Sequence, residues 1–171
     1  MEKHKINILH YENPESTLLL GEFHGKLCLC DWKNRTDREH LDRRLQTVLK
    51  AKYVEERTPL LDETVRQLDA YFLGKRQQFD LPLLTVGTLF QKSVWDVVSS
   101  IPYGHTLSYK TLALKTGRAE AVRAVATAVG ANALSLCIPC HRVVGNDGTL
   151  RGYAGGLETK KSLLEMEGAL C

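Results

Sequence analysis

The chain has 171 residues, of which 43% are hydrophobic and 25% charged, and its net charge is +3. This length allows one domain or two small domains with real cores. No stretch approaches the roughly 20 apolar residues of a membrane span, and the first residues lack the apolar run of a signal peptide. These features argue against a membrane or secreted protein, so we expect an intracellular one, cytoplasmic or, in a eukaryote, nuclear.

Charge and cysteine content add two further expectations. Residues 1–85 hold 14 basic and 14 acidic side chains, whereas residues 86–171 hold 9 and 6. Because Lys and Arg bind nucleic acid by neutralising phosphates, this asymmetry favours contact of the second half with a polyanion. Five cysteines at uneven spacing indicate reactive, metal-binding or packed thiols rather than a disulfide framework.

The first half predicts a small mixed domain without a recognisable chemical motif. Residues 17–22 and 26–30 are strand-like on either side of a His24-Gly25 turn, which indicates a hairpin. A first helix is expected from the spacing of Leu41, Leu45, Val48 and Leu49. A second helix is expected from Thr58-Pro59 to Gly74, with an apolar face formed by Leu61, Val65, Leu68 and Phe72.

The second half begins with a helix after a linker at residues 80–82. Thr88 and Gln91 form a capping-box pattern at its start, and Pro102-Tyr103-Gly104 ends it. Its expected buried positions are Phe90, Val94, Val97 and Ile101.

A pair of short helices then suggests helix-turn-helix geometry. Ser108 is a plausible N-cap for a helix over residues 109–115, closed by Gly117, and a second helix is expected from about Ala119 to Val129. The apolar face of the second helix is Val122, Val125, Ala126 and Val129. The side chains on the opposite face are mostly small, with Arg123 as the one long cation. This face holds Glu120, Arg123, Ala124, Thr127, Ala128 and Ala131. Such a face allows either close approach to DNA or packing on another helix.

The densest chemistry lies in Cys137-Ile138-Pro139-Cys140-His141. Four interpretations compete: a haem-attachment C-x-x-C-H, a redox pair or half zinc site, a single Cys140 nucleophile with His141 as its base, and two core thiols beside a structural histidine. Haem attachment needs export, and no second C-x-x-C completes a zinc ribbon. A redox pair should open a helix, whereas Val143-Val144 and the following turn predict a strand that enters a hairpin.

Pro139-Cys140-His141-Arg142-Val143 resembles the active-site motif of the O6-alkylguanine-DNA alkyltransferases, the methylated-DNA–protein-cysteine methyltransferases. The resemblance runs from about Thr88 to Gly168 in order and spacing. It implies an α+β fold: a small N-terminal ribonuclease-H-like α/β domain over 1–85, structural in role, and a mainly helical, winged helix-turn-helix-like domain over 86–171 that binds DNA and accepts the alkyl group.

The resemblance also implies a role for each candidate site residue. Cys140 would accept the alkyl group, His141 would take the thiol proton through a water, Glu167 would orient His141, and Asn132 would tie the turn before the active site. Among residues that touch DNA or substrate, Tyr109 would favour extrusion of the base from the duplex, and Arg123 would fill the place that the base leaves in the stack. The remaining members of that set are Ala124, Thr127, Tyr153 and Ala154.

The implied reaction is a single irreversible transfer of a methyl or small alkyl group from O6 of guanine, and from O4 of thymine, after base flipping through the minor groove. The expected partner is double-stranded DNA with an alkylated guanine, bound by a monomer, and no cofactor or metal is needed because the protein itself is the acceptor. The sequence departs from the family pattern at three places. Ala126-Thr127 stands where many members carry glycine, Ala133 stands where a proline is usual, and Ala154 lacks a hydroxyl found in some relatives.

Two rival functions use the same residues differently. One is a DNA-binding protein that recognises alkylated guanine without repairing it. The other is a metal or redox protein that uses Cys137 and Cys140. A structural zinc site built from the first domain is a further alternative to simple packing, with His4, His10, His24, Cys28 and Cys30 as its candidates.

Overall fold

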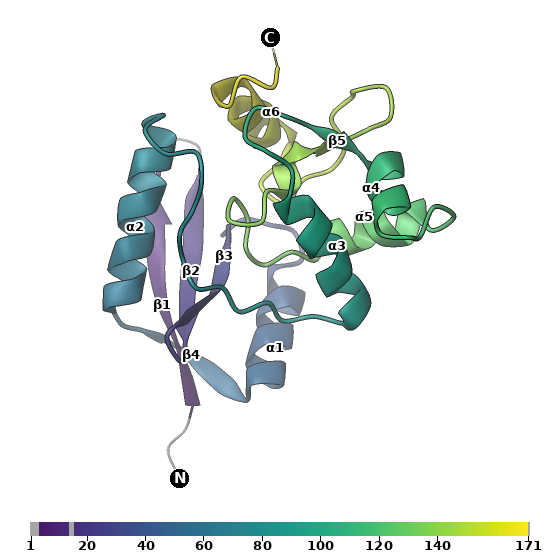
Figure 1. Cartoon of the computed structure of the whole chain (residues 1–171). Helices are drawn as coiled ribbons and strands as arrows, with labels where there is room; N and C mark the ends of the chain where they lie inside the picture. Colours follow the sequence, from purple (N-terminus) through teal and green to yellow (C-terminus); the bar gives the residue numbers. More distant parts are fainter. Residues whose placement is uncertain (1–3, 14–15, 171) are drawn as a thin grey trace. The chain divides into compact units, whose positions relative to one another are not determined.

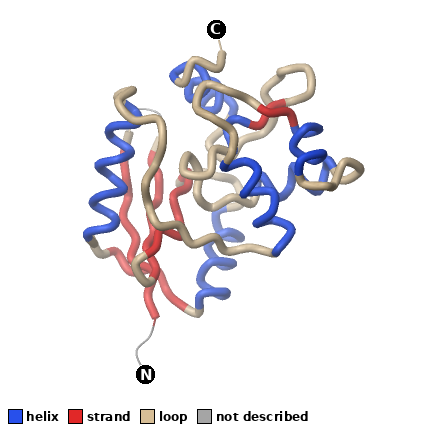
Figure 2. Tube along the Cα trace, in the orientation of Figure 1, coloured by secondary structure: helices blue, strands red, loops and turns tan. Residues whose placement is uncertain are grey.

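A computed structural model describes residues 4–13 and 16–170. The chain forms two compact units that divide between Val86 and Gly87. The first holds a sheet with two helices and the second is mainly helical, which confirms the expected α+β class (Figures 1 and 2). Within the described part of the chain, no helix combines the length and apolar character that crossing a membrane requires.

The sheet of the first unit has the strand order β3-β2-β1-β4. Its strands are β1 (His4–Glu12), β2 (Thr17–Phe23), β3 (Lys26–Trp32) and β4 (Ala51–Glu55). The predicted hairpin is confirmed, because β2 and β3 pair antiparallel around His24 and Gly25, both of which have positive φ. β4 pairs with β1 in parallel, so the sheet is mixed.

The two predicted helices of this unit are present as α1 (Arg38–Leu49) and α2 (Pro59–Phe72), but their buried faces differ from the prediction. Val48 is 60% exposed, because the chain leaves α1 at Lys50 and enters β4 immediately. On α2, Val65 and Phe72 are only half-buried. The face that α2 buries is instead Leu61, Thr64, Gln67, Leu68 and Tyr71.

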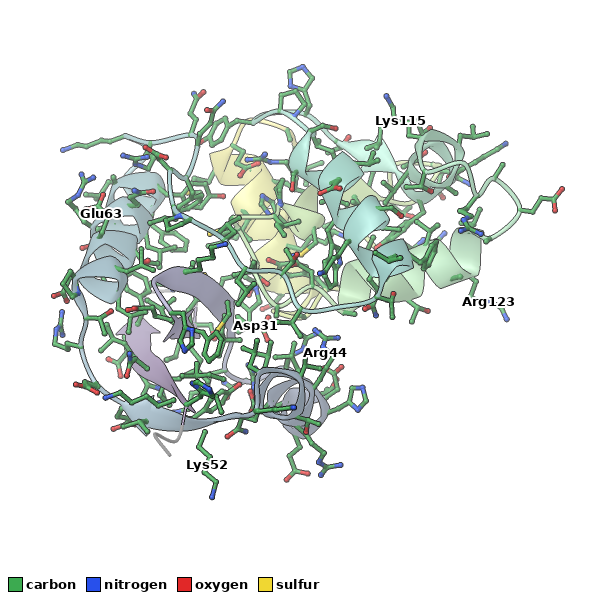
Figure 3. The ribbon with its side chains drawn as sticks, turned by 60° about the horizontal axis from the view of Figure 1, so that its bottom comes forward. Asp31, Arg44, Lys52, Glu63, Lys115 and Arg123 are labelled. Carbon is green, nitrogen blue, oxygen red and sulfur yellow. The ribbon has the colours of Figure 1, made fainter. Side chains whose placement is uncertain are left out.

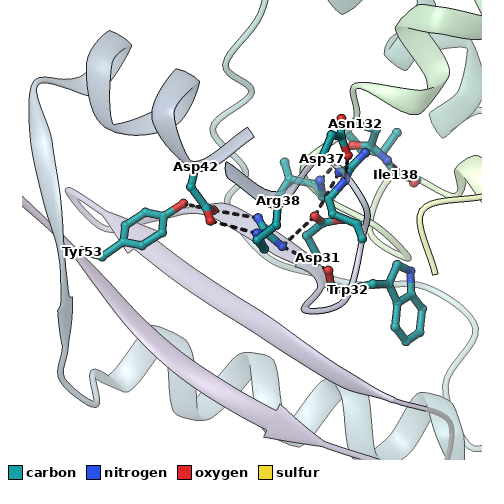
Figure 4. A network of polar contacts seen from close by, with 10 residues as sticks. Asp31, Trp32, Asp37, Arg38, Asp42, Tyr53, Asn132 and Ile138 are labelled. Atoms are coloured by element: carbon teal, nitrogen blue, oxygen red, sulfur yellow. Dashed lines mark hydrogen bonds and ion pairs between the residues drawn. The ribbon is translucent and has the colours of Figure 1, made fainter. Parts of the chain in front are cut away.

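A buried ionic network ties β3 to α1 and β4 (Figure 4). The fully buried carboxylate of Asp31 accepts hydrogen bonds from Arg35 and Arg38, both at 3.0 Å. Arg38 also donates to both carboxylate oxygens of Asp42, and Tyr53 on β4 donates its hydroxyl to Asp42 at 2.6 Å. Burial and this bond raise the pKa of Tyr53, so its hydroxyl stays a donor.

The second unit begins with α3 (Leu89–Ser99), whose capping box between Thr88 and Gln91 is confirmed. Its buried face is rotated from the predicted one: Val94, Trp95 and Val98 are buried, whereas Phe90 and Val97 are only partly so. Trp95 explains the rotation. Its indole N–H donates to the Ala128 carbonyl at 2.8 Å, which satisfies the one polar atom of a large buried ring.

The helix-turn-helix consists of α4 (Tyr109–Lys115) and α5 (Val122–Gly130). The Ser108 cap is confirmed by its bond from the Thr111 N–H, and Gly117 has the positive φ expected after α4. α5 begins later than Ala119, because residues 118–121 form a turn closed by a bond from Ala121 N to Arg118 O.

Only part of the predicted small face of α5 is exposed. Arg123, Ala124 and Thr127 are exposed, whereas Ala128 is buried against Trp95, which corrects the prediction for that residue. Arg123 projects from the first turn of α5 (Figure 3).

The segment after α5 carries the candidate nucleophile and ends in α6 (Leu157–Met166). Cys140 opens one 3-10 turn, η1 (Cys140–Arg142), which leads into β6 (Val143–Val144). The predicted hairpin after β6 is wrong, because β6 pairs in parallel with β5 (Leu107–Ser108), far earlier in the chain. The local pattern identified the strand but not its partner.

We expect Asp31→Asn to lower the free energy of unfolding by about 3 kcal/mol, because the buried Arg35 and the partly buried Arg38 lose their shared carboxylate. Urea titration of the full chain measures this loss. Glu63→Gln on the surface of α2 is the matched control (Figure 3) and should leave the midpoint unchanged. Equal midpoints for the two variants would contradict a structural role for the Asp31 network.

Candidate active site around Cys140

Cys140 lies at the bottom of a small hollow in the second unit. Its side chain is 6% exposed, and its backbone N–H donates to Ile138 O at 2.7 Å. The hollow has a volume of about 50 Å³. It is lined by Tyr109, Ala126, Val129, Gly130, Asn132, Cys140, Gly152, Tyr153 and Ala154. Four of the predicted site residues, Tyr109, Asn132, Tyr153 and Ala154, are therefore gathered around the thiol.

Asn132 fixes the turn that precedes the thiol. Its side-chain amide donates to Ile138 O and its oxygen accepts from Leu134 N, both at 2.9 Å (Figure 4). Between these two residues Leu136 has a φ of 70°, a conformation that L-residues rarely adopt. The two bonds from a buried amide hold this turn, and thereby set the position of Cys140 two residues beyond Ile138.

His141 and Glu167 are buried and do not line the hollow. His141 Nε2 is 2.9 Å from Glu167 Oε2, and neither side chain is exposed. Arg142 binds the same carboxylate through Nε at 2.8 Å and Nη2 at 3.0 Å, and its Nη1 donates to Ile101 O. The Glu167 carboxylate is thus neutralised by a guanidinium and also accepts a bond from the imidazole.

The protonation of His141 follows from this arrangement. Burial lowers the pKa of His141, and the bond to Glu167 opposes that shift only in part. An ionised carboxylate accepts hydrogen bonds only, so the neutral imidazole carries its proton on Nε2 and presents a lone pair on Nδ1. Nδ1 is buried and has no hydrogen-bond partner among the described residues. It is the atom of His141 that is available as a base.

Lys160 is a site residue that the sequence analysis missed. It is fully buried, its ammonium donates to Arg151 O at 3.2 Å, and it lies 5.9 Å from the centre of the Tyr109 ring. Burial lowers the pKa of Lys160 to about 8, and the charge of Cys140 opposes that shift. Burial, and then Cys140, raise the pKa of Tyr109. Negative charge on Cys140 therefore acts to raise the pKa of both Lys160 and Tyr109.

The signal for Lys160 was helical spacing. Lys160 precedes the buried Leu163 and Leu164 by three and four residues, which places it on the buried face of α6. Its neighbour Lys161 lies on the exposed face. In the sequence the two adjacent lysines look like one solvated pair.

A wider groove adjoins the hollow and shares Tyr109, Ala126, Gly130 and Gly152 with it. Its volume is about 720 Å³. The other lining residues are Val122, Arg123, Gly145, Asn146 and Arg151. Of the remaining predicted contacts, Arg123 lines this groove, whereas Ala124 and Thr127 are exposed on α5 and line neither space.

No disulfide joins Cys28, Cys30, Cys137 or Cys140, and within residues 4–13 and 16–170 no three His, Cys, Asp or Glu side chains are placed to hold a metal ion. Cys171 lies outside the described residues.

A helix-turn-helix beside a hollow that contains one cysteine, followed in the chain by a histidine bound to a buried glutamate, is the arrangement expected of a DNA-binding protein that uses a cysteine. Residues 89–169 match the DNA binding domain of 6-O-methylguanine DNA methyltransferase, and residues 26–85 match its ribonuclease-like domain. The chain belongs to this family.

Named relatives agree with both matches. A methylated-DNA–protein-cysteine methyltransferase of Methanosarcina barkeri is 52% identical over 105 residues, which are 61% of this chain and 66% of the relative. One of Methanosarcina acetivorans is 48% identical over 107 residues, 63% of this chain and 69% of the relative. The Mycobacterium tuberculosis OGT structure in complex with DNA superposes with a TM-score of 0.80 at 35% identity, covering 95% of this chain and 93% of that one.

We expect the burial of neutral His141 to make the protein less stable in acid. The pKa of His141 is lowered from 6.5 in the folded chain, so below about pH 6.5 the unfolded chain binds a proton that the folded chain does not. Stability then falls as the pH drops, by up to about 1.4 kcal/mol per pH unit.

Urea titrations between about pH 5 and 8 measure this slope. His141→Gln should flatten it, and His105→Gln, which changes an exposed ring, should not. Proton NMR of the His141 ring provides an independent check. Titration of that ring near pH 6.5 in the folded protein would show that burial does not hold it neutral.

Proposed function

We propose that the chain repairs DNA by moving a methyl or small alkyl group from O6 of guanine to Cys140, once per molecule. The observation that carries the proposal is the enclosed thiol with His141 and Glu167 in series behind it. In the transfer, Cys140 Sγ forms a bond to the alkyl carbon as the bond from that carbon to O6 breaks. The electron pair stays on O6, and the products are guanine and an S-alkylcysteine.

Activation of the thiol uses the groups buried around it. His141 Nδ1 takes the thiol proton through a bridging water, and Glu167 holds the imidazole in the tautomer that leaves Nδ1 basic. The Lys160 ammonium stabilises the resulting thiolate. Asn132 keeps the turn in place, so that the nucleophile is positioned before the substrate arrives.

The two adjoining spaces suit an extruded nucleotide. A thiol that is 6% exposed cannot reach a stacked base, so the base must leave the helix. The wider groove receives the base, and Tyr153 and Ala154 line the smaller hollow that adjoins it. The hollow of about 50 Å³ then takes the alkyl group, which favours methyl over large substituents.

The helix-turn-helix binds the DNA and positions it against the groove. α5 presents Arg123, Ala124 and Thr127 to the minor groove, where short side chains allow close approach, and Arg123 fills the gap that the base leaves. The N-terminal unit has a structural role. Activity on O4 of thymine, a monomeric state, and a cytoplasmic or nuclear location stay predictions. No cofactor is required, because Cys140 is itself the acceptor.

The test is the intact mass and peptide map of the protein after incubation with a duplex that carries one O6-methylguanine. We expect one added methylene mass on the peptide that contains Cys140, with matching loss of the lesion. Cys140→Ser should bind the duplex and gain no mass. Continued lesion loss in that variant would disprove the acceptor assignment, and tight binding by the unmodified chain without any mass gain would favour the lesion-recognition alternative.

Lys160→Met should slow alkylation of Cys140 about tenfold at neutral pH, the factor that corresponds to ~1.4 kcal/mol of lost thiolate stabilisation. Methionine keeps most of the lysine's volume but not its charge. Lys161→Met removes the exposed neighbouring charge and should react at the wild-type rate. Timed iodoacetamide labelling of Cys140, with Cys137 as internal reference, gives both rates. Equal rates in the two variants would remove Lys160 from the mechanism.

A further inference from the structure

The groove beside the thiol hollow has two cations in its wall. Nine residues line it, and of these only Arg123 on α5 and Arg151 in the loop after β6 are charged. Neither arginine lines the hollow that contains Cys140. Both therefore face whatever enters the groove without touching the alkyl group.

These two arginines differ from the other arginines of the second unit. Arg142 is paired with Glu167, and the Arg118 guanidinium lies 5.4 Å from the centre of the Phe90 ring. Within the described ranges, no carboxylate lies at ion-pair distance from Arg123 or Arg151. Asp147, on the same loop as Arg151, is hydrogen-bonded to Thr149 and acts on Arg151 only at longer range. Positive charge that is unpaired in the protein and lines a groove indicates an anionic ligand.

The loop that carries Arg151 is fixed at several points. Asn146 Oδ1 accepts from Lys110 N at the start of α4, Gly145 N donates to Thr149 O, and the buried Lys160 ammonium holds the Arg151 carbonyl. A Cβ on Gly145 would come within 2.9 Å of Arg151 Nε, so the arginine side chain lies against the Gly145 backbone. Arg151 is held at the groove by backbone contacts, while its guanidinium stays exposed.

We propose that Arg151 binds a backbone phosphate of the DNA strand that passes along the groove. The inference rests on the proposed function and assigns a second DNA contact to its site. A base that enters the groove comes from a strand whose phosphates lie at the edge of the groove, and these phosphates are equally present in unmodified DNA. The guanidinium matches a phosphate in charge and in bidentate geometry, and Arg123 is already assigned to the vacated stack.

A phosphate contact has a signature that distinguishes it from base or alkyl recognition. Each neutralised phosphate releases counterions. The slope of log affinity against log salt concentration therefore becomes steeper by about 0.9 per phosphate on duplex DNA and by about 0.7 on a single strand. Phosphates are present in every sequence and in both substrates. The effect of Arg151 is therefore the same on any sequence and does not depend on a lesion.

The experiment measures the affinity of the full chain for an unmodified duplex and its single strand, by fluorescence anisotropy from about 50 to 200 mM salt. We expect Arg151→Gln to weaken binding to both and to reduce the slope by about 0.9 and 0.7 respectively, and Arg151→Lys to keep most of the slope. Lys161→Gln, which removes one exposed charge outside the groove, should leave both slopes unchanged. The exposed position of Arg151 makes a folding defect easy to exclude by thermal unfolding.

Three outcomes would overturn the assignment. They are an unchanged slope in Arg151→Gln, a loss confined to the duplex, and a loss of methyl transfer from free O6-methylguanine base, which has no phosphate. Methyl transfer from alkylated duplex to wild-type Cys140 is measured in parallel. If the wild type transfers no methyl group but the slope still shifts, the proposed function fails and the phosphate contact stands.

Discussion

The second unit depends on one buried carboxylate. Glu167 follows α6, and it binds the Arg142 guanidinium through both oxygens and the His141 imidazole through one. Arg142 in turn holds Ile101 O at the end of α3. Removing such a carboxylate would leave a buried guanidinium uncompensated, which costs several kcal/mol. The same interaction thus joins three segments and determines which nitrogen of His141 can act as a base.

Two sets of buried charged side chains determine the electrostatics of the site, the Glu167–Arg142 pair and Lys160. Glu167 and Arg142 neutralise each other deep in the unit, so His141 stays neutral and its pKa is lowered by burial. Lys160 is fully buried, and burial lowers its own pKa to about 8, a shift that the charge of Cys140 opposes. A buried ammonium gains from a thiolate nearby, and the thiolate gains equally from the ammonium.

α5 serves packing and recognition with different faces of nine residues. Val125, Ala128 and Val129 are buried, and Ala128 accepts the Trp95 indole bond. Val129 and Ala126 also line the thiol hollow, whereas Arg123 lines only the groove. Val129 is therefore both a core residue and part of the wall of the hollow, so a substitution there would alter stability and the shape of the hollow together.

The sequence by itself determined the features that depend on neighbouring residues. The caps at Thr88 and Ser108, the hairpin around His24-Gly25 and the motif at Cys140 are local patterns, and each was readable from residue type and spacing. Only the tertiary structure decided what depends on distant partners. These features are the parallel pairing of β5 with β6, the rotation of α3 by the Trp95 bond, the burial of Lys160 and the exposure of Arg151 at the groove. The physical reason is that burial and charge pairing are set by contacts across the fold, which adjacent residues do not encode.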